Sequence, residues 1–213
     1  MVHFRSIIAT AVLLFTMVGC STVTIKHHAI GHQPPLCNQN AKEKIAVYWG
    51  TAWRTDQKDV LIREKYIEEG IDTFFNENDC FETVLIAKSV AGKDAMLATD
   101  TDLISGGNAA GADKVFVFRV EELGPNLYLY LSPILWQTKN EVLLQVRVLN
   151  TKTGEVESDL STQWMRGGPF TLHSANTLPT DLSGVLKAIF YGKRKFKAAN
   201  QALLKGNVRA EIV

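Results

Sequence analysis

The most distinctive side-chain chemistry in this sequence belongs to three cysteines, Cys20, Cys37 and Cys80. Cys20 follows the apolar run 7–18 after one small residue, Gly19, and polar residues begin directly behind it. The basic residue Arg5 precedes the run, whose 12 residues are short of the ~20 that span a bilayer as a helix. This pattern predicts a secretory signal peptide over 1–19 that is removed in front of Cys20.

The four residues 17–20, MVGC, resemble the lipobox of bacterial lipoproteins, in which an aliphatic residue, a small residue and Gly or Ala precede an acylated cysteine. Met17 stands where Leu is more usual. The resemblance implies acylation of Cys20, with palmitate among the chains, and Ser21 behind it implies sorting to the outer membrane in enteric-type bacteria. Such chains anchor a protein firmly, because each buried CH₂ contributes about 0.8 kcal/mol. A plain signal peptide whose cysteine falls at the cut by chance is the alternative.

Cys37 and Cys80 are the two cysteines left over. In an oxidising periplasm such a pair predicts a disulfide rather than a metal site. A bridge between them would close a loop of about 44 residues, worth about 4 kcal/mol on the chain-entropy model. Two unpaired buried thiols are the alternative, because a sequence does not give the distance between them.

Patterns for nucleophilic or phosphate chemistry are weak. The chain has no G-x-S-x-G elbow, and His173 is the only histidine outside residues 1–43, so a serine triad is poorly supported. The glycine-rich stretch 105–113 lacks the Lys-Ser or Lys-Thr pair of a Walker loop. We therefore expect no enzymatic activity and no cofactor.

Two acid pairs, Asp100 with Asp102 and Glu121 with Glu122, have the side chains that general acid and base catalysis uses. At these spacings they are more typical of a helix cap and a solvated strand end. The one histidine cluster consists of His27, His28 and His32. It lies in a proline-containing segment and lacks a fourth ligand, so we expect no catalytic and no metal-binding residues.

The segment LYLYLSPILW, 127–136, is the main candidate for a binding surface. Eight of its ten residues are Leu, Ile, Tyr or Trp, and none is charged. Since Tyr and Trp are enriched at interfaces, we predict a partner-binding surface formed by Tyr128, Tyr130 and Trp136 that faces another protein or the membrane. A strand buried within its own domain is the alternative, and Pro133 argues against a transmembrane strand.

Helices and strands alternate through the first half of the expected domain. The apolar runs 44–49 and 81–88 are predicted strands, and an amphipathic helix from Val60 separates them. A second helix is predicted over 99–110, and a strand begins at Lys114.

Strands follow one another after Pro125, and the turn sequence NTKTG separates two of them. A last helix is predicted to start near Thr180 or Asp181. The fold class expected is therefore α+β: a mixed β-sheet flanked by helices, βαβα followed by a β-meander and a C-terminal helix.

Four regions are predicted along the chain. A signal peptide over 1–19 precedes the lipidated cysteine and a flexible tether over 20–43, which would let the body stand roughly 50 Å off the membrane. The globular periplasmic domain covers 44–192, and a basic C-terminal tail covers 193–213.

The order of KIAVYWG, REKYIEEGIDTFFNE, FETVLIAK, DLISGGNAAGADKVFVFRVEEL and VLLQVRVLNTKTGEVES resembles a known group. It is similar to the envelope lipoproteins built on the fold of the TolB N-terminal domain, which include the curli secretion lipoprotein and the activator lipoproteins of penicillin-binding proteins. The resemblance covers roughly 44–190 and implies a non-enzymatic task in assembly, secretion or enzyme activation. The segment 123–139 has no counterpart in the group.

Charge adds one exclusion. Removal of the signal peptide would leave 22 Lys and Arg against 22 Asp and Glu, a balance that argues against nucleic acid as a partner. The sequence thus predicts an outer-membrane-anchored periplasmic lipoprotein that binds other envelope proteins as an accessory, with homo-oligomerisation left open. The alternatives are a small-molecule, lipid or glycan binding module, and a hydrolase of the cell wall or of lipids.

Overall fold

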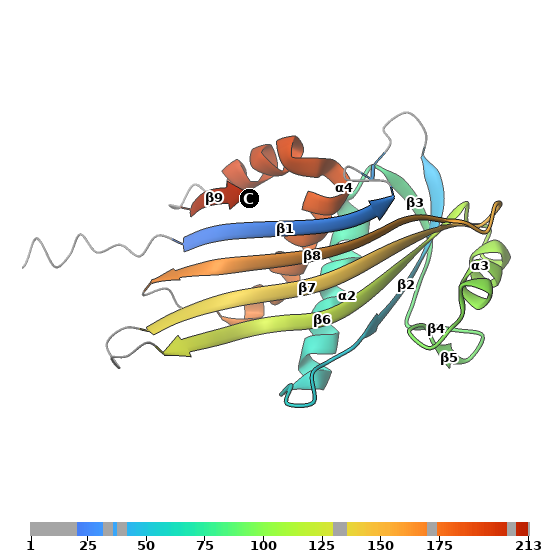
Figure 1. Cartoon of the computed structure of the whole chain (residues 1–213). Helices are drawn as coiled ribbons and strands as arrows, with labels where there is room; N and C mark the ends of the chain where they lie inside the picture. Colours follow the sequence, from blue (N-terminus) through green and yellow to red (C-terminus); the bar gives the residue numbers. More distant parts are fainter. Residues whose placement is uncertain are drawn as a thin grey trace, which may run out of the picture.

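The computed structural model describes residues 21–31, 36–37, 42–129, 136–169, 174–203 and 208–212. They form a seven-stranded mixed sheet in the order β3-β2-β6-β7-β8-β1-β9, with helices packed against it (Figure 1). The predicted α+β class and the predicted order of elements are confirmed.

The strands of the sheet are β1 (Ser21–Gly31), β2 (Glu43–Thr51), β3 (Phe81–Ala87), β6 (Lys114–Leu129), β7 (Trp136–Asn150), β8 (Val156–Pro169) and β9 (Val208–Ile212). A small separate hairpin joins β4 (Ser89–Val90) and β5 (Lys93–Asp94). The helices are α2 (Val60–Glu77), α3 (Asp100–Ala109), the short η1 (Ala175–Thr177) and α4 (Leu178–Leu203).

The first half of the fold is a parallel unit. Strand β2 lies between β3 and β6 and runs parallel to both, so α2 and α3 serve as crossover helices. The near-continuous apolar run of β2 reflects burial on both faces, as the sequence predicts. Helix α2 turns Ile67, Ile71 and Phe74 toward the sheet.

The second half is an antiparallel meander. Strands β6 and β7 pair from Lys114 opposite Asn150 to Leu129 opposite Trp136, and β8 follows antiparallel to β7. The turn between β7 and β8 is held by the Asn150 side chain, whose Oδ1 accepts from the backbone N–H groups of Lys152 and Thr153.

One face of the sheet, called the helix face here, carries the main core. Helices α2 and α4 cover it together (Figure 1). Aromatic rings from helix and strand meet there: the ring centroids of Phe74 and Phe190 lie 5.1 Å apart, and those of Phe116 and Phe190 lie 5.2 Å apart. Such pairs stabilise beyond the area that they bury.

The predicted flexible tether is wrong for residues 21–31. They form strand β1, which pairs with β8 over ten residues. Val23 and Ile25 are 3% and 2% exposed, because their side chains are part of the core on the helix face. Residues 21–31 are therefore part of the folded body, and they are not a spacer that holds it off the membrane.

The predicted separate basic tail over 193–213 is wrong as well. Helix α4 continues to Leu203, with a break at Gly192, whose φ of 71° lies in the left-handed region that favours glycine. Strand β9 then pairs in parallel with β1. In the described part of the chain, no helix is long and apolar enough to cross a membrane.

Candidate functional site

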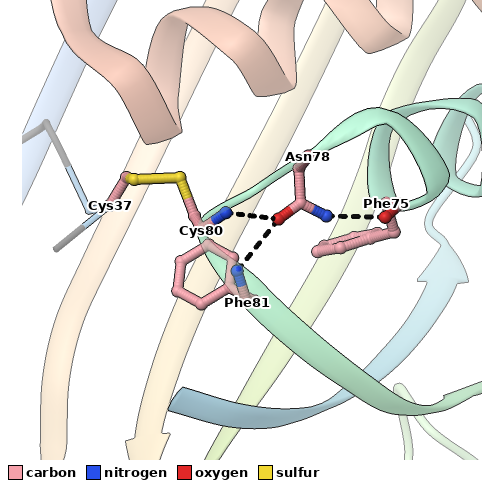
Figure 2. The surroundings of a disulfide bond; sticks show 5 residues. All are labelled: Cys37, Phe75, Asn78, Cys80 and Phe81. Carbon is pink, nitrogen blue, oxygen red and sulfur yellow. Dashed lines mark hydrogen bonds between the residues drawn. A yellow bond between two sulfur atoms is a disulfide. The ribbon is translucent and has the colours of Figure 1, made fainter. Parts of the chain in front are cut away.

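The disulfide between Cys37 and Cys80 is confirmed. Their Cα atoms lie 5.5 Å apart, and Cys80 is buried (Figure 2). The N–H of Cys37 also donates to the carbonyl of Phe190 in α4 at 2.8 Å. The bridge therefore joins the segment before β2 to the start of β3 and brings both against α4.

Asn78 shapes the chain next to this bridge. Its Oδ1 accepts from the N–H groups of Cys80 and Phe81, each at 3.0 Å, and its Nδ2 donates to the carbonyl of Phe75 at 2.7 Å (Figure 2). Asn78 thus ends α2 and starts β3 in one step, which places Cys80 for pairing.

The proposed lipidation site, Cys20, lies outside the described residues. Ser21, to which it is bonded, is the first residue of β1. Consecutive Cα atoms are ~3.8 Å apart, so an acyl group on Cys20 would be joined to the sheet with no intervening linker.

The end of the sheet where β1 begins is called the anchor end here. In one row across it, Thr22 of β1 lies opposite Gly167, Gly167 opposite Lys139, and Lys139 opposite Asn126. The β6–β7 hairpin is therefore at the same end of the sheet as Ser21 (Figure 1).

The predicted aromatic surface falls on this hairpin. The backbone of Tyr128 lies in β6 opposite Gln137, and that of Trp136 lies in β7 opposite Leu129. Tyr130 and the side chains of Tyr128 and Trp136 lie outside the described part, so their partner-binding role stays a prediction.

The first acid pair has a structural role. Thr99 and Asp102 form a capping box at the start of α3, as the sequence suggests. The Thr99 N–H, donating to Asp102 at 3.1 Å, lowers the pKa of that carboxyl, which suits a cap and not a general acid. Asp100 instead accepts from Arg147 at 2.7 and 2.8 Å.

The second acid pair is divided by a β-bulge in β6. Glu121 faces Arg119 at 3.4 Å, while Glu122 is 6% exposed and lies 3.1 Å from Arg54. Burial raises the pKa of Glu122, and the Arg54 and Arg63 charges offset part of that effect. The bulge pairs Glu122 with Leu143 and returns Leu123 to the core opposite Val142. The sequence pattern misses this buried carboxylate, because Arg54 and Arg63 beside it are distant in sequence.

A second buried carboxylate was also missed. Asp181, 2% exposed, accepts from Asn140 at 2.7 Å and from Arg166 at 3.1 Å, and Thr177 lies 3.3 Å away. This network fixes the first turn of α4 on β7 and β8. Asn140 and Asp181 are 41 residues apart in sequence, so no local sequence pattern predicts the network.

The face of β6, β7 and β8 opposite the helix face is called the open face. It consists of Arg119, Glu121, Glu141, Leu143, Gln145, Asp159, Ser161, Gln163 and Met165, which alternate with core residues. Figure 1 shows α2 and α4 behind the sheet and α3 at the end away from the anchor end. No described helix lies over the middle of this face.

The side chains of the open face bind one another. Gln163 donates to Glu141 at 2.6 Å, and Gln145 donates to Asp159 at 2.9 Å. Leu143 and Met165 are half-buried, Leu143 opposite Gln163 and Met165 opposite Glu141. The open face therefore carries two half-buried apolar side chains among polar side chains that are already hydrogen-bonded.

Cavities lined by described residues open on the surface in at least two places. One of about 330 Å³ lies where α3 meets the open face, with Leu103, Val117 and Met96 beside Arg119 and Arg147. Another, about 450 Å³, lies between α2 and β3. It is lined by Trp49, Leu61, Glu64, Glu68, Ile86 and Lys88 among others.

The two described histidines of the cluster, His27 and His28, do not converge. His27 and His28 are consecutive residues of strand β1, so they point to opposite faces, and His27 Nδ1 lies 2.9 Å from Thr162 Oγ1. His32 and His173 lie outside the described residues. Among the described residues no group of three potential metal ligands is present.

Comparisons with known proteins give distant likenesses only. No family model matches the sequence, and no curated protein is significantly similar to it. Similar solved structures include the PelC dodecamer from Paraburkholderia phytofirmans, at 12% identity over 79% of this chain and 99% of that one, with a TM-score of 0.46. They also include lipoprotein GNA1162 from Neisseria meningitidis, at 13% identity over 69% of this chain and 97% of that one, with a TM-score of 0.34. A third is the LpoB C-terminal domain from Salmonella enterica, at 14% identity over 63% of this chain and 87% of that one, with a TM-score of 0.33. Likenesses at this level define neither a family nor a function.

Proposed function

We propose that this protein is a lipid-anchored envelope accessory that acts by binding other envelope proteins rather than by catalysis. Two observations support a location in the envelope: the lipobox-like sequence at Cys20, and the Cys37–Cys80 disulfide, because disulfides form and persist in oxidising compartments. Ser21 behind the cysteine supports anchorage in the outer membrane, on its periplasmic face, by the sorting pattern of enteric-type bacteria.

The observation that carries the binding role is the open face. Antiparallel sheets tolerate one solvated face, but apolar side chains among hydrogen-bonded polar ones are also typical of a protein interface. Leu143 and Met165 are the half-buried apolar side chains here, and Gln163, Glu141, Gln145 and Asp159 are the hydrogen-bonded polar ones. A partner that covers this face would find the polar side chains already ordered, which lowers the entropic cost of binding.

A photo-crosslinking residue at position 165 tests this proposal in living cells. We expect an adduct of defined mass at position 165, which lies on the part of the open face where β8 meets β1. The matched control is position 61, since Leu61 is 82% exposed but lies on α2, away from this face. Adducts at 61 and none at 165 would place the partner elsewhere and contradict the proposal.

The anchor is tested separately by the mass of the protein extracted from its membranes. An acylated chain that starts at Cys20 is expected. An unmodified chain would contradict the proposed lipid anchor. The crosslinking result would still test the proposed binding role independently.

A second candidate function is binding of a small polar ligand in the 330 Å³ cavity beside α3. Its volume is at the lower end of the range for ligand pockets. Arg119, Gln145 and Asp159 line it together with apolar side chains. Binding of envelope glycan fragments, measured by calorimetry on the wild type and on Gln145→Leu, would support this reading if only the wild type binds.

A further inference from the structure

The register of the sheet gives the level of the start of β1 relative to the ends of β6 and β7. Thr22 lies in the row that contains Gly167, Lys139 and Asn126. Leu129, opposite Trp136, is three residues, or about 10 Å, farther along the strand direction than this row. Cys20 is bonded to Ser21, the first residue of β1, so it is two residues from Thr22 along the chain.

The lateral separation is also small. Three strand spacings separate β1 from β6 in the order of the sheet, or about 14 Å at ~4.8 Å each. A bilayer surface that takes up acyl chains from Cys20 therefore reaches the ends of β6 and β7 as well, unless the sheet is tilted steeply away from it.

The composition of these strand ends suits a lipid interface. Residues 127–136 carry no charge, so entering the headgroup region costs no ionic desolvation. Tyr and Trp prefer this region because one end of each side chain is apolar and the other is polar.

Positive charge adds to the fit. Arg209 of β9 pairs with Thr22 in the sheet, and Lys139 occupies the same row. Cations at this level of the molecule would lie near lipid phosphates.

We propose that the anchor end of the sheet rests directly on the phospholipid surface and that the β6–β7 hairpin, through Tyr128, Leu129 and Trp136, enters the headgroup region beside the acylated cysteine. The proposal rests on the proposed lipidation of Cys20. It assigns the aromatic segment to lipid instead of a protein partner, and it leaves the open face standing out from the membrane, accessible to proteins.

Tryptophan quenching tests this seating. The acylated full chain, its mass confirmed, is placed in phosphatidylethanolamine and phosphatidylglycerol vesicles with or without bromine on the acyl chains. We expect bromine to quench part of the tryptophan fluorescence, and we expect that quenched component to be lost in Trp136→Phe.

Trp49→Phe is the matched control. Trp49 pairs with Phe118, ten residues before Tyr128 along β6 and so about 30 Å from the anchor end, and its replacement should leave the quenched component intact. Equal quenching in wild type and Trp136→Phe, with the acyl chains present, overturns the proposal while the anchor stands.

Two other outcomes also count against the proposal. In native membranes, protection of Trp136 from both bromolipid and aqueous acrylamide would assign the hairpin to a protein partner. A chain found without acyl groups would remove the premise and with it the seating, a failure that the mass measurement identifies separately.

Discussion

The two faces of the central sheet differ although the same strands form both. On the helix face, Phe116, Phe118 and Val120 of β6 are at most 1% exposed and pack under two helices. On the open face, Arg119 of the same strand is exposed and pairs with Glu121. The comparison teaches that the helix face carries the larger of two hydrophobic cores. The opposite face has a smaller core under α3, and beyond it the open face keeps polar side chains that are available for binding.

The largest effect is expected at neighbouring positions on opposite faces. Phe118→Ala removes a fully buried ring that contacts Phe75 and Phe190, and should lower the free energy of unfolding by about 3–5 kcal/mol. Arg119→Ala, one residue along, should change it by less than about 0.5 kcal/mol. Urea unfolding of the two variants measures the difference, and equal losses would erase the distinction between the faces.

The disulfide sharpens the comparison, because it ties the chain to the helix face through α4. Replacing both Cys37 and Cys80 by Ser should lower the free energy of unfolding by about 4 kcal/mol, the loop entropy for a separation of 43 residues. Unfolding of the double variant, compared with the wild type under oxidising conditions, tests this. Reduction of the wild type should reproduce the loss, and a reductant that changes nothing would contradict the account.

The buried carboxylate Glu122 gives a smaller, pH-dependent effect. Because burial raises its pKa in the folded state, the folded protein binds more protons than the unfolded one just above the ordinary glutamate pKa of 4.5. Its contribution therefore makes the protein less stable as pH rises from that value through the folded pKa. Glu122→Gln should lack this loss, so the stability of the variant relative to wild type should rise with pH over this window. A difference that is constant with pH would show that Arg54 and Arg63 offset the burial completely.

Much of the fold follows from local patterns. The apolar run of β2, the helical spacing from Val60 and the cap at Thr99 each act over a few residues, and the structure agrees with each. The predicted disulfide followed from compartment and number alone.

The errors came from segments whose structure depends on distant partners. Residues 21–31 contain the alternation Val23, Thr24, Ile25, Lys26, a strand pattern that the neighbouring signal peptide and prolines obscured. It becomes a strand because β8, 135 residues away at the pairing of His27 with Thr162, offers an edge. The environment of Glu122 depends in the same way on Arg54 and Arg63, and that of Asp181 depends on the register of β7 against β8, so neither can be recognised from local sequence.

The smallest expected change in stability is the most informative for function. Leu143→Gln with Met165→Gln exchanges two half-buried apolar side chains on the open face for polar ones of similar length, so unfolding should shift by about 1 kcal/mol or less. Crosslinking to the envelope partner, with the photo-reactive group at position 161 beside them, should nevertheless be lost, since the apolar centre of an interface provides most of its binding energy. Leu97→Gln, at an 81% exposed position outside the open face, should leave both measurements unchanged. If the double variant keeps its partner, the open face is only a solvated surface, and the difference between the two faces reflects stability alone.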